Sequence, residues 1–384
     1  MKAIFFFAAL LGLLACNNQN NQNNPSIQSN PNTQSTQLSL DEAIGEMLLV
    51  GFRGTEIDST HHIWRDIRDY HVGSVILFDY DAPTGTRGRN IKSANQVKAL
   101  CGQLRKLSPT LLIGIDQEGG RVSRLSTKYG FPAILSAQKS AEKGFDTVRH
   151  CAQLTAELLH DLGINLNFAP VADVNVNPDC PVIGKLGRSF STKPSVVTQC
   201  CTLWIDEQHA KGVASCLKHF PGHGSATGDT HKGLVDVSKT WQRGELIPYQ
   251  KLCKLNKLDM VMTAHVINRQ LDPSGLPASL SPKITSYLRD TLGFQGVIVT
   301  DDLAMGAIAG QYNLEQTVRM ALDAGADLLC LSNNGGYGYD PQLVPKVVKI
   351  IHKLIDDGTV SPERIHQSAE RVRALKRRFS TTTQ

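Results

Sequence analysis

Eight short apolar runs alternate along the chain with longer amphipathic stretches, and this alternation constrains the fold more than any other feature. The runs lack a regular polar alternation, which is typical of strands buried on both faces of a parallel sheet. Helices are expected between them; in the stretch 281–294, Ser281 can cap a helix, Pro282 suits its first turn and Gly293 suits its end. The runs are 48–52, 73–78, 111–116, 165–170, 213–220, 260–266, 297–302 and 327–332.

Eight such units within about 330 residues predict an α/β fold, a (β/α)8 TIM-type barrel that forms a single catalytic domain over residues 39–384. The alternative is a doubly wound open sheet, which typically has fewer strands and a glycine-rich phosphate loop after the first one. No G-x-G-x-x-G motif follows the first run, and the sequence contains no Walker motif. The barrel is therefore the preferred expectation.

The first sixteen residues have the features of an export signal. Lys2 gives a positive start, and the apolar segment 3–14 is too short to span a bilayer. Residues 13–16, Leu-Leu-Ala-Cys, resemble a bacterial lipobox, in which cleavage falls before Cys16 and its thiol carries a lipid. The alternative is an ordinary secretory peptide with a chance cysteine. Residues 17–38 are rich in asparagine and glutamine and are expected to form a disordered linker.

These features predict an exported lipoprotein, attached to the membrane by its N-terminal lipid anchor at the periplasmic face or the cell surface. Asn18 stands where an aspartate would favour retention in the inner membrane, which points to the outer membrane. The formal net charge of +5 is spread along the chain and does not indicate a nucleic-acid partner. The basic cluster 371–378 is expected to be the solvated face of a last helix, with contact to anionic lipid or peptidoglycan as the alternative.

Eight cysteines remain besides Cys16, and their spacing fits no metal-binding C-x-x-C pattern. In an exported protein some of them could form disulfides, although the sequence does not reveal which. Others are expected to be small buried apolar residues.

Polar residues lie at or just beyond the ends of five of the eight runs. In a parallel barrel these positions meet at the C-terminal face, where barrel enzymes build their active sites. One such residue could arise by chance, but five from different strands indicate a functional site. The residues are Asp116, Asp173, His219, His265 and Asp301.

Asp301 and Asp302 are adjacent at the end of the seventh run. Side chains alternate along a strand, so we expect one aspartate to face the mouth of the barrel and the other to hold a loop. The functional interpretation is a carboxylate nucleophile. The structural one, a cap of the following helix, fits the sequence about equally well.

The segment Pro221–His231, "PGHGSATGDTH", places titratable groups on a glycine-rich loop. Such a loop can open for substrate and close again, carrying a proton donor to the site. Asp229 can orient the imidazole of His231 and favour its protonated form, which makes the pair a candidate acid/base dyad. Two alternatives are an ordinary surface loop and a metal site formed by His219, His223, His231 and Asp229.

Six motifs, taken in order, resemble those of the β-N-acetylglucosaminidases of glycoside hydrolase family three. Any one of them alone is weak evidence, but the ordered set is specific and covers roughly residues 40–375. The motifs are "IDQEGGRVSRL" (115–125), "FAPVADV" (168–174), "GRSF" (187–190), "KHFPGHGSATGDTH" (218–231), "MTAHV" (262–266) and "GVIVTDDLAM" (296–305).

The resemblance implies a retaining double displacement within a barrel, without metal or cofactor. Asp301 aligns with the nucleophile, His231 with the acid/base and Asp229 with the carboxylate that assists it. A further set aligns with residues that hold the terminal N-acetylglucosamine: Asp116, Arg124, Arg188, Lys218 and His219.

The function expected from this resemblance is the release of terminal N-acetylglucosamine from peptidoglycan fragments or chito-oligosaccharides by a monomeric enzyme. Two other classes stay open, a metal-dependent hydrolase and a non-catalytic sugar-binding lipoprotein. Thr230 replaces the commoner serine of the family's dyad motif, and the segment 178–186 is longer than in compact members.

Overall fold

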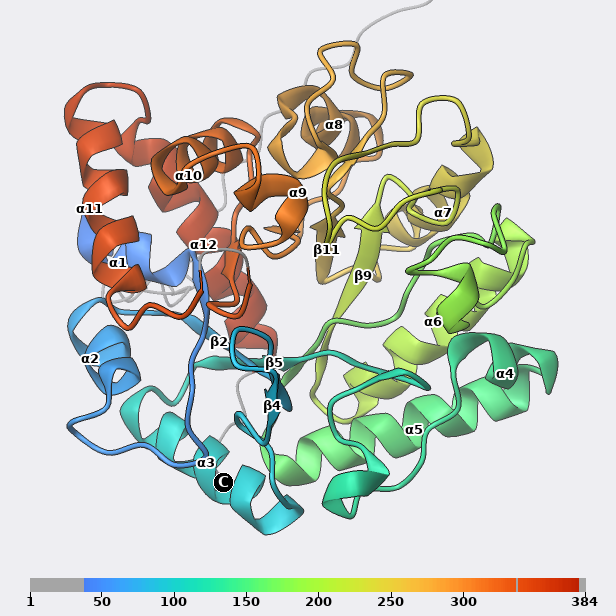
Figure 1. Ribbon diagram of the computed structural model, residues 1–384, viewed down its shortest axis with the longest axis horizontal. Helices are drawn as coiled ribbons and strands as arrows, with labels where there is room; N and C mark the ends of the chain where they lie inside the picture. Colours follow the sequence, from blue (N-terminus) through green and yellow to red (C-terminus); the bar gives the residue numbers. More distant parts are fainter. Residues whose placement is uncertain (1–37, 336–337, 380–384) are drawn as a thin grey trace, which may run out of the picture. The chain divides into compact units, whose positions relative to one another are not determined.

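The computed structural model describes residues 38–335 and 338–379 of the 384-residue chain. Eight parallel strands form one sheet in the order β13-β11-β9-β8-β5-β2-β1-β14, and a parallel bridge between Val299 and Leu328 joins its two ends (Figure 1). The strands are β1 (Leu48–Gly51), β2 (Ser74–Leu77), β5 (Leu112–Ile115), β8 (Leu166–Asn167), β9 (Ala214–Phe220), β11 (Met260–Thr263), β13 (Val297–Thr300) and β14 (Leu329–Leu331). Each coincides with one of the eight apolar runs, so the predicted barrel is confirmed and the open sheet is wrong.

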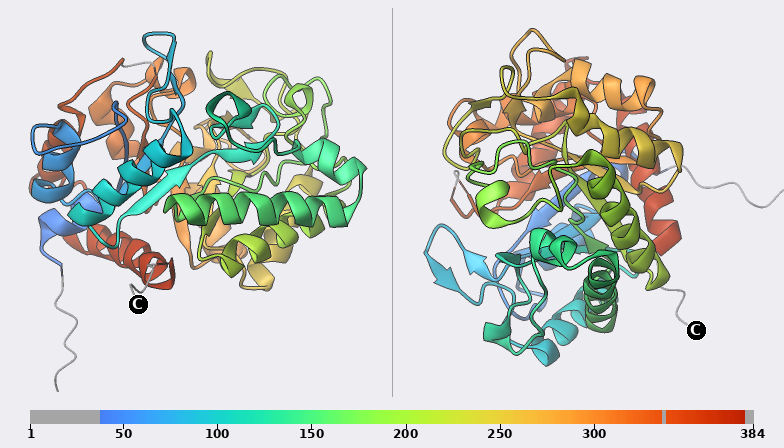
Figure 2. Two further views of the ribbon diagram at one scale, coloured as in Figure 1. Left: turned by 90° about the horizontal axis from the view of Figure 1, so that it is seen from below. Right: turned by 90° about the vertical axis from the view of Figure 1, so that its right-hand side faces the viewer.

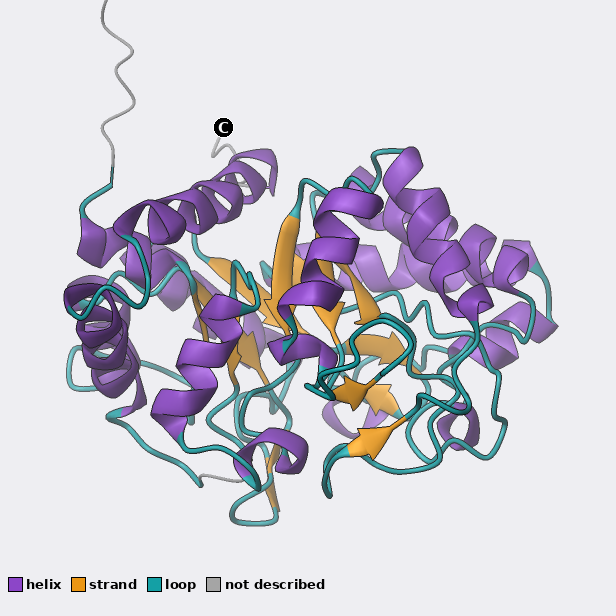
Figure 3. Ribbon diagram, turned by 90° about the horizontal axis from the view of Figure 1, so that it is seen from above, coloured by secondary structure: helices purple, strands orange, loops and turns teal. Residues whose placement is uncertain are grey.

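Helices follow the strands and lie outside them, as Figure 3 shows. The helix predicted over 281–294 begins as expected, because the Ser281 side chain accepts a hydrogen bond from the Ile284 amide. Its second half, Tyr287–Thr291, is a π-helix. The α-helices are α1 (Leu40–Glu46), α2 (His62–Asp69), α3 (Ala94–Leu107), α4 (Ala137–Glu142), α5 (Phe145–Leu162), α6 (Pro194–Ala210), α7 (Ile247–Lys254), α8 (Pro282–Ser286), α9 (Gly306–Ala309), α10 (Leu314–Asp323), α11 (Leu343–Asp356) and α12 (Pro362–Phe379).

Three short strand pairs lie in the loops between these elements. Two are antiparallel hairpins, β3 (Tyr80–Asp81) with β4 (Thr86–Arg87) and β6 (Gln117–Gly119) with β7 (Val122–Ser123). The third pair, β10 (Val235–Asp236) with β12 (Val266–Ile267), is parallel. Both hairpins follow C-terminal ends of barrel strands and so shape the face where the polar residues gather.

The apolar core lies on both sides of the barrel wall, which explains why the strand sequences lack alternation. Inside the barrel, side chains such as Leu49, Leu112 and Met260 pack together with Val372 and Phe379 of α12. Outside, two larger clusters fill the space between strands and helices. The last helix therefore contributes side chains to the core inside the barrel.

The basic cluster 371–378 is only in part the solvated face that the sequence suggested. The side chain of Lys376 is 4% exposed and forms an ion pair with Glu46 of α1, which lies beside α12 in Figure 2. Arg371 pairs with Asp327 at 3.0 Å, and Arg378 pairs with the buried carboxylate of Asp259 at 2.9 Å. The solvated-face prediction is wrong for Lys376, which is buried against α1, whereas the Arg378 side chain is 54% exposed and agrees with the prediction.

Eight cysteines lie among the described residues, and all are free thiols. Seven are buried, which fits the interpretation of small apolar core residues. Within 38–335 and 338–379, no helix is long and apolar enough to cross a membrane. Cys16, the signal peptide 1–16 and all of the linker except Leu38 lie outside the described residues.

Candidate active site

The C-terminal ends of the barrel strands surround a cavity of about 370 Å³. Of the residues singled out from the sequence for catalysis or sugar binding, only Asp229 does not line this cavity directly. Seven do: Asp116, Arg124, Arg188, Lys218, His219, His231 and Asp301. The fold therefore brings residues from four sequence motifs, far apart in the chain, to one site.

A network of alternating charges forms one wall of the cavity. Lys218, at the end of β9, donates hydrogen bonds from Nζ to Asp116 Oδ1 and to Glu118 Oε1, both at 2.7 Å. Arg188 donates two hydrogen bonds of 2.8 Å to the two carboxylate oxygens of Glu118. Arg124 completes the network by donating to Asp116 Oδ2 at 3.3 Å. Three cations and two carboxylates are thus held in fixed geometry before any substrate arrives.

The cations of this network determine the protonation of its acids. Burial alone would raise the pKa of Glu118, but the positive charges of Arg188 and Lys218 outweigh it and lower the pKa to about 2. Burial likewise opposes ionisation of Asp116, and Lys218 and Arg124 lower its pKa nonetheless. Both carboxylates are therefore anionic throughout the neutral range and act as hydrogen-bond acceptors.

Glu118 was not among the residues singled out from the sequence, although it lies in the same "DQEGGR" motif as Asp116. Asp116 directly follows β5 and Glu118 lies two residues further on, in β6; side chains two apart in an extended chain project to the same face. That alternation was the available signal. Glu118 is the contact that joins Arg188, from the loop after β8, to Lys218 on β9.

His219 is oriented by a buried carboxylate beneath the cavity. Its Nδ1 lies 2.6 Å from Asp173 Oδ2, and its Nε2 lies 3.3 Å from Arg188. Asp173 also accepts a hydrogen bond of 2.8 Å from the His223 amide. Asp173, placed by the sequence at the active face, thus holds the histidine from below and does not line the cavity itself.

The two adjacent aspartates after β13 have different surroundings. Asp302 accepts hydrogen bonds from the Ser332 hydroxyl at 2.5 Å and from the amides of Ser332 and Ala304. Asp301 accepts one from the Asp302 amide, at 2.8 Å. Asp302 therefore holds the loop after β14, whereas the Asp301 carboxylate is left with capacity to contact a ligand.

Charges around Asp301 favour its anionic form. Burial would raise its pKa, but the nearby His265 and His219 lower it below the usual value for aspartate. Burial raises the pKa of Asp302. His265, another strand-end residue, is held between the Ser279 hydroxyl at 2.6 Å and the Asp302 carbonyl at 2.9 Å. It contributes to the electrostatics of Asp301 from behind the cavity wall.

His231 and Asp229 form a hydrogen-bonded pair on the loop after β9. Nδ1 of His231 lies 2.8 Å from Asp229 Oδ1, and the same oxygen accepts the His231 amide at 2.9 Å. The His231 side chain is 64% exposed, and it lines the same cavity as Asp301. Burial opposes ionisation of Asp229, but hydrogen bonds from His231 lower its pKa. The pair is thus a carboxylate that orients an accessible imidazole.

The glycine-rich loop is tied to the barrel at both ends of its sequence. Near its start, Trp241 donates to the Pro221 carbonyl at 3.0 Å, and a Cβ at Gly224 would lie 1.8 Å from the Val174 carbonyl oxygen. Further along, the Ala307 amide donates to the Thr230 carbonyl at 3.0 Å. His223 reaches from the buried half of the loop to the Thr230 hydroxyl at 3.3 Å. These contacts place the dyad over the loop that follows β13.

The longer segment 178–186 forms part of the cavity rim. Val182 and Leu186 line the cavity, and the Val182 carbonyl accepts a hydrogen bond of 2.8 Å from Arg188. Cys180 is buried and free. The segment therefore contributes apolar side chains to the site in addition to positioning Arg188.

The four residues considered as metal ligands do not form a ligand set. His219 is paired with Asp173, whereas His231 is paired with Asp229. In the part of the chain that the structure describes, no group of three or more His, Cys, Asp or Glu side chains is arranged to hold a metal ion.

Comparisons with known proteins agree with this geometry. The model of the glycosyl hydrolase family 3 N terminal domain matches residues 39–375. A β-hexosaminidase of Tolumonas auensis is 37% identical over 297 residues, which are 75% of this chain and 83% of that protein. The structure of a glycoside hydrolase family 3 β-N-acetylglucosaminidase from Paenibacillus sp. str. FPU-7 superposes with a TM-score of 0.79 at 34% identity. The match covers 89% of this chain and 62% of the Paenibacillus chain, so this chain spans less than two thirds of that enzyme.

A β-N-acetylhexosaminidase from Beutenbergia cavernae DSM 12333 matches over almost its whole length. The TM-score is 0.76 at 28% identity, and the match covers 88% of this chain and 98% of that one. The chain belongs to glycosyl hydrolase family 3, and it is a glycoside hydrolase.

Proposed function

We propose that this enzyme is a retaining exo-β-N-acetylglucosaminidase that releases terminal N-acetylglucosamine from peptidoglycan fragments or chito-oligosaccharides. The observation that carries the proposal is the shared cavity of Asp301 and His231, which border it from two different strand-end loops. The charged wall of Asp116, Lys218 and Arg188 supplies hydrogen-bonding groups for sugar hydroxyls in the same cavity.

In the first step, a carboxylate oxygen of Asp301 attacks the anomeric carbon while the bond to the leaving oxygen breaks. The His231 imidazolium gives its Nε2 proton to that oxygen, and the product of the step is a covalent glycosyl-aspartate. The lowered pKa of Asp301 keeps the nucleophile anionic at neutral pH. Asp229, on Nδ1, stabilises the imidazolium and leaves Nε2 free for the proton transfer.

In the second step, neutral His231 takes a proton from water, and the oxygen of that water attacks the anomeric carbon. The bond to Asp301 breaks, its carboxylate is regenerated, and the sugar leaves with the configuration of the substrate retained. The same imidazole serves both steps, first as acid and then as base.

A substrate-assisted route, in which the acetamido group of the sugar acts as nucleophile, would need a second acid to orient that group. Asp302 is the adjacent candidate, but both of its carboxylate oxygens accept hydrogen bonds from Ser332, and one also accepts the Ala304 amide. Because these hydrogen bonds commit Asp302 to the loop after β14, we favour the double displacement by Asp301.

We further propose that the enzyme is a lipoprotein, attached through Cys16 and acting outside the inner membrane as a monomer. The support is the sequence of residues 1–38, with its short apolar signal, the Leu-Leu-Ala-Cys segment and the polar linker. An enzyme on such a linker could reach cell-wall glycans from the membrane to which its lipid is attached.

The test is a screen of the purified enzyme on nitrophenyl β-glycosides with a strong chelator present, in parallel with the Asp301→Ala variant. We expect the wild type to cleave the N-acetylglucosaminide and to release the β-anomer first, as observed by NMR, and the variant to lose this activity. Near-normal turnover by Asp301→Ala would overturn the nucleophile assignment. Inactivation by the chelator would favour a metal-dependent hydrolase, and a folded wild type without any glycosidase activity would favour a binding protein.

A further inference from the structure

Three large side chains line the cavity between its floor and its mouth. Ile76 of β2, Phe78 after it and Tyr80 of β3 all line the cavity. The chain bends at Asp79, between the phenylalanine and the tyrosine. Ile76 is 3% exposed and Tyr80 is 40% exposed, so the tyrosine lies at the mouth.

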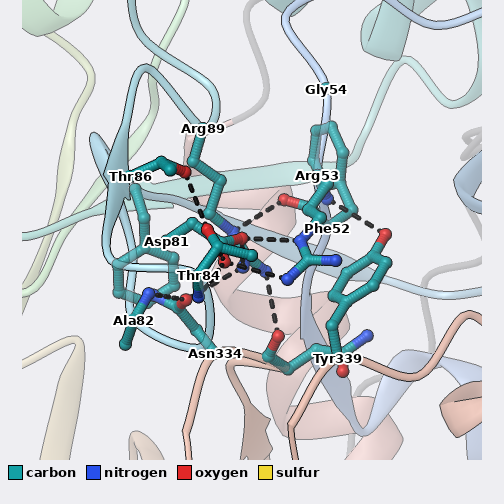
Figure 4. A network of polar contacts seen from close by, with 12 residues as sticks. Phe52, Arg53, Gly54, Asp81, Ala82, Thr84, Thr86, Arg89, Asn334 and Tyr339 are labelled. Atoms are coloured by element: carbon teal, nitrogen blue, oxygen red, sulfur yellow. Dashed lines mark hydrogen bonds and ion pairs between the residues drawn. The ribbon is translucent and has the colours of Figure 1, made fainter.

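The β3–β4 hairpin that carries Tyr80 is held by a buried charge network, shown in Figure 4. Asp81 accepts two hydrogen bonds from Arg53, at 2.6 and 2.9 Å, and one of 2.7 Å from Arg89. The Arg89 side chain is fully buried and also donates to the Ser332 and Asn333 carbonyls. The hairpin is therefore tied to the loops that follow β1 and β14.

Contacts of Asn334 fix the backbone on either side of Asp81. Its side-chain amide donates to the Tyr80 carbonyl at 3.1 Å, and its Oδ1 accepts the Ala82 amide at 2.9 Å. Arg87, opposite Tyr80 in the hairpin, places its guanidinium 5.7 Å from the centre of the tyrosine ring and donates to Asp79 at 3.1 Å. The ring is thus presented at the cavity mouth by a rigid support.

We propose that Tyr80 is the stacking platform of a leaving-group subsite, which binds the second pyranose ring of an oligosaccharide substrate. This inference rests on the proposed exo-N-acetylglucosaminidase function. The apolar C–H face of a pyranose packs against an aromatic ring, whose π-system carries partial negative charge on its face. In an exo-enzyme the leaving group points toward the cavity mouth, where Tyr80 lies, whereas Asp116 and Lys218 hold polar positions at the strand ends.

The test compares two substrates that differ only in whether a second ring is present. N,N′-diacetylchitobiose has a sugar leaving group, and N-acetyl-β-glucosaminyl fluoride leaves fluoride, which cannot stack. We expect Tyr80→Ala to lower kcat/KM on the disaccharide by about 3- to 10-fold, the effect of losing one stacking contact. The kcat/KM of the variant on the glycosyl fluoride should equal that of the wild type. Tyr80→Phe, which keeps the ring, should retain the wild-type ratio between the substrates.

Phe145→Ala is the matched control, since Phe145 is 39% exposed and lies at the start of α5, outside the cavity lining. It should alter neither rate. If Tyr80→Ala unfolds thermally like the wild type but loses kcat/KM equally on both substrates, the proposed subsite is overturned. That result would place the tyrosine ring at the terminal sugar. No loss on the disaccharide would also overturn the subsite. A wild type inactive on both substrates would instead defeat the proposed function.

Discussion

Glu118 and Arg188 face each other through two hydrogen bonds of 2.8 Å, and the same carboxylate accepts a third from Lys218 at 2.7 Å. The pair joins the loop after β8 to β6, and Lys218 links it to β9. The three cations of the charged wall, Lys218, Arg188 and Arg124, are paired with two carboxylates, Asp116 and Glu118, so the wall keeps one net positive charge. Because these hydrogen-bonding groups are already fixed, substrate binding does not include the free-energy cost of ordering them.

Glu118→Gln should weaken both stability and activity. The variant leaves Arg188 and Lys218 beside a neutral amide, and loss of one partner of a buried ion pair lowers the free energy of unfolding by about 3 kcal/mol. Displacement of Arg188 and Lys218 should lower kcat/KM on a nitrophenyl N-acetylglucosaminide by on the order of 100-fold. Urea unfolding and steady-state kinetics measure the two effects.

The exposed Glu142 on α4 provides the matched control, since Glu142→Gln makes the same chemical change away from the cavity lining. That variant should match the wild type in both measurements. If Glu118→Gln also matched it, the network would contribute nothing to either property.

The barrel could be predicted from the sequence because its strands are buried on both faces. Burial from inside and outside removes the polar alternation, and that pattern is visible without any contact information. The strand-end positions of Asp116 and Asp301 followed from the same pattern. The ion pairs of α12 could not be predicted this way, because the partners of Lys376 and Arg378, which are Glu46 and Asp259, lie far away in the sequence.

Much of the site depends on loops, and there the sequence was less informative. Glu118 was missed although its spacing from Asp116 gave a local signal. Tyr80 gave none, because its position at the cavity mouth depends on Arg89 and Asn334, which come from different loops. Tertiary contacts between loops decide such positions, and no periodicity in the chain encodes them.

Gly306→Ala should displace the dyad loop. A Cβ at this position would lie 2.4 Å from the His231 carbonyl oxygen, which is backbone and cannot move away without shifting the loop. We expect kcat on a substrate with a poor leaving group to fall by about 10- to 100-fold, because the proton donor is misplaced. Inhibition by free N-acetylglucosamine should change little, since the charged wall lies elsewhere.

The control for this variant is Gly102→Ala on α3, where an added Cβ meets no atom within 4 Å. It should keep full activity and gain slightly in stability, because alanine favours a helix more than glycine does. Unchanged kinetics in Gly306→Ala would mean that the loop position seen here is not the one used in catalysis.

Glu245 should make the enzyme less stable as the pH rises. Its carboxylate is buried under the glycine-rich loop, where it accepts the Gly224 amide at 3.2 Å, and burial raises its pKa to about 7. Between the unfolded value of 4.5 and pH 7 the folded state holds more protons than the unfolded state, so stability falls across this window. The loss amounts to roughly 3 kcal/mol by pH 8.

Glu245→Gln removes this titration. The free energy of unfolding of the variant, measured by urea at several pH values, should therefore rise relative to that of the wild type between pH 4.5 and 8. A difference that stays constant across this range would show that Glu245 ionises normally in the folded enzyme.

Cys16→Ala should release the enzyme from the membrane. The thiol of Cys16 is the group that would carry the diacylglyceryl chain in a lipobox, and among the described residues no helix is long and apolar enough to cross a membrane. Cell fractionation with an activity assay should find the wild type with membranes and the variant in the soluble or secreted fraction. Retention of the variant on membranes would contradict the lipoprotein proposal.

His231→Ala should affect substrates according to how much their leaving groups need a proton. A dinitrophenolate leaves readily as an anion, whereas a sugar alkoxide does not. Loss of the proton donor should therefore lower the rate of the first step about 100-fold or more for the disaccharide, and much less for the dinitrophenyl glycoside. The control is Thr227→Ala, because Thr227 is exposed on the same loop. This variant should keep both rates near those of the wild type. Rates of glycosyl-enzyme formation measure the effect, because the later step also uses the imidazole. Equal losses on the two substrates would assign His231 a structural role, since a proton donor must discriminate between leaving groups of different basicity.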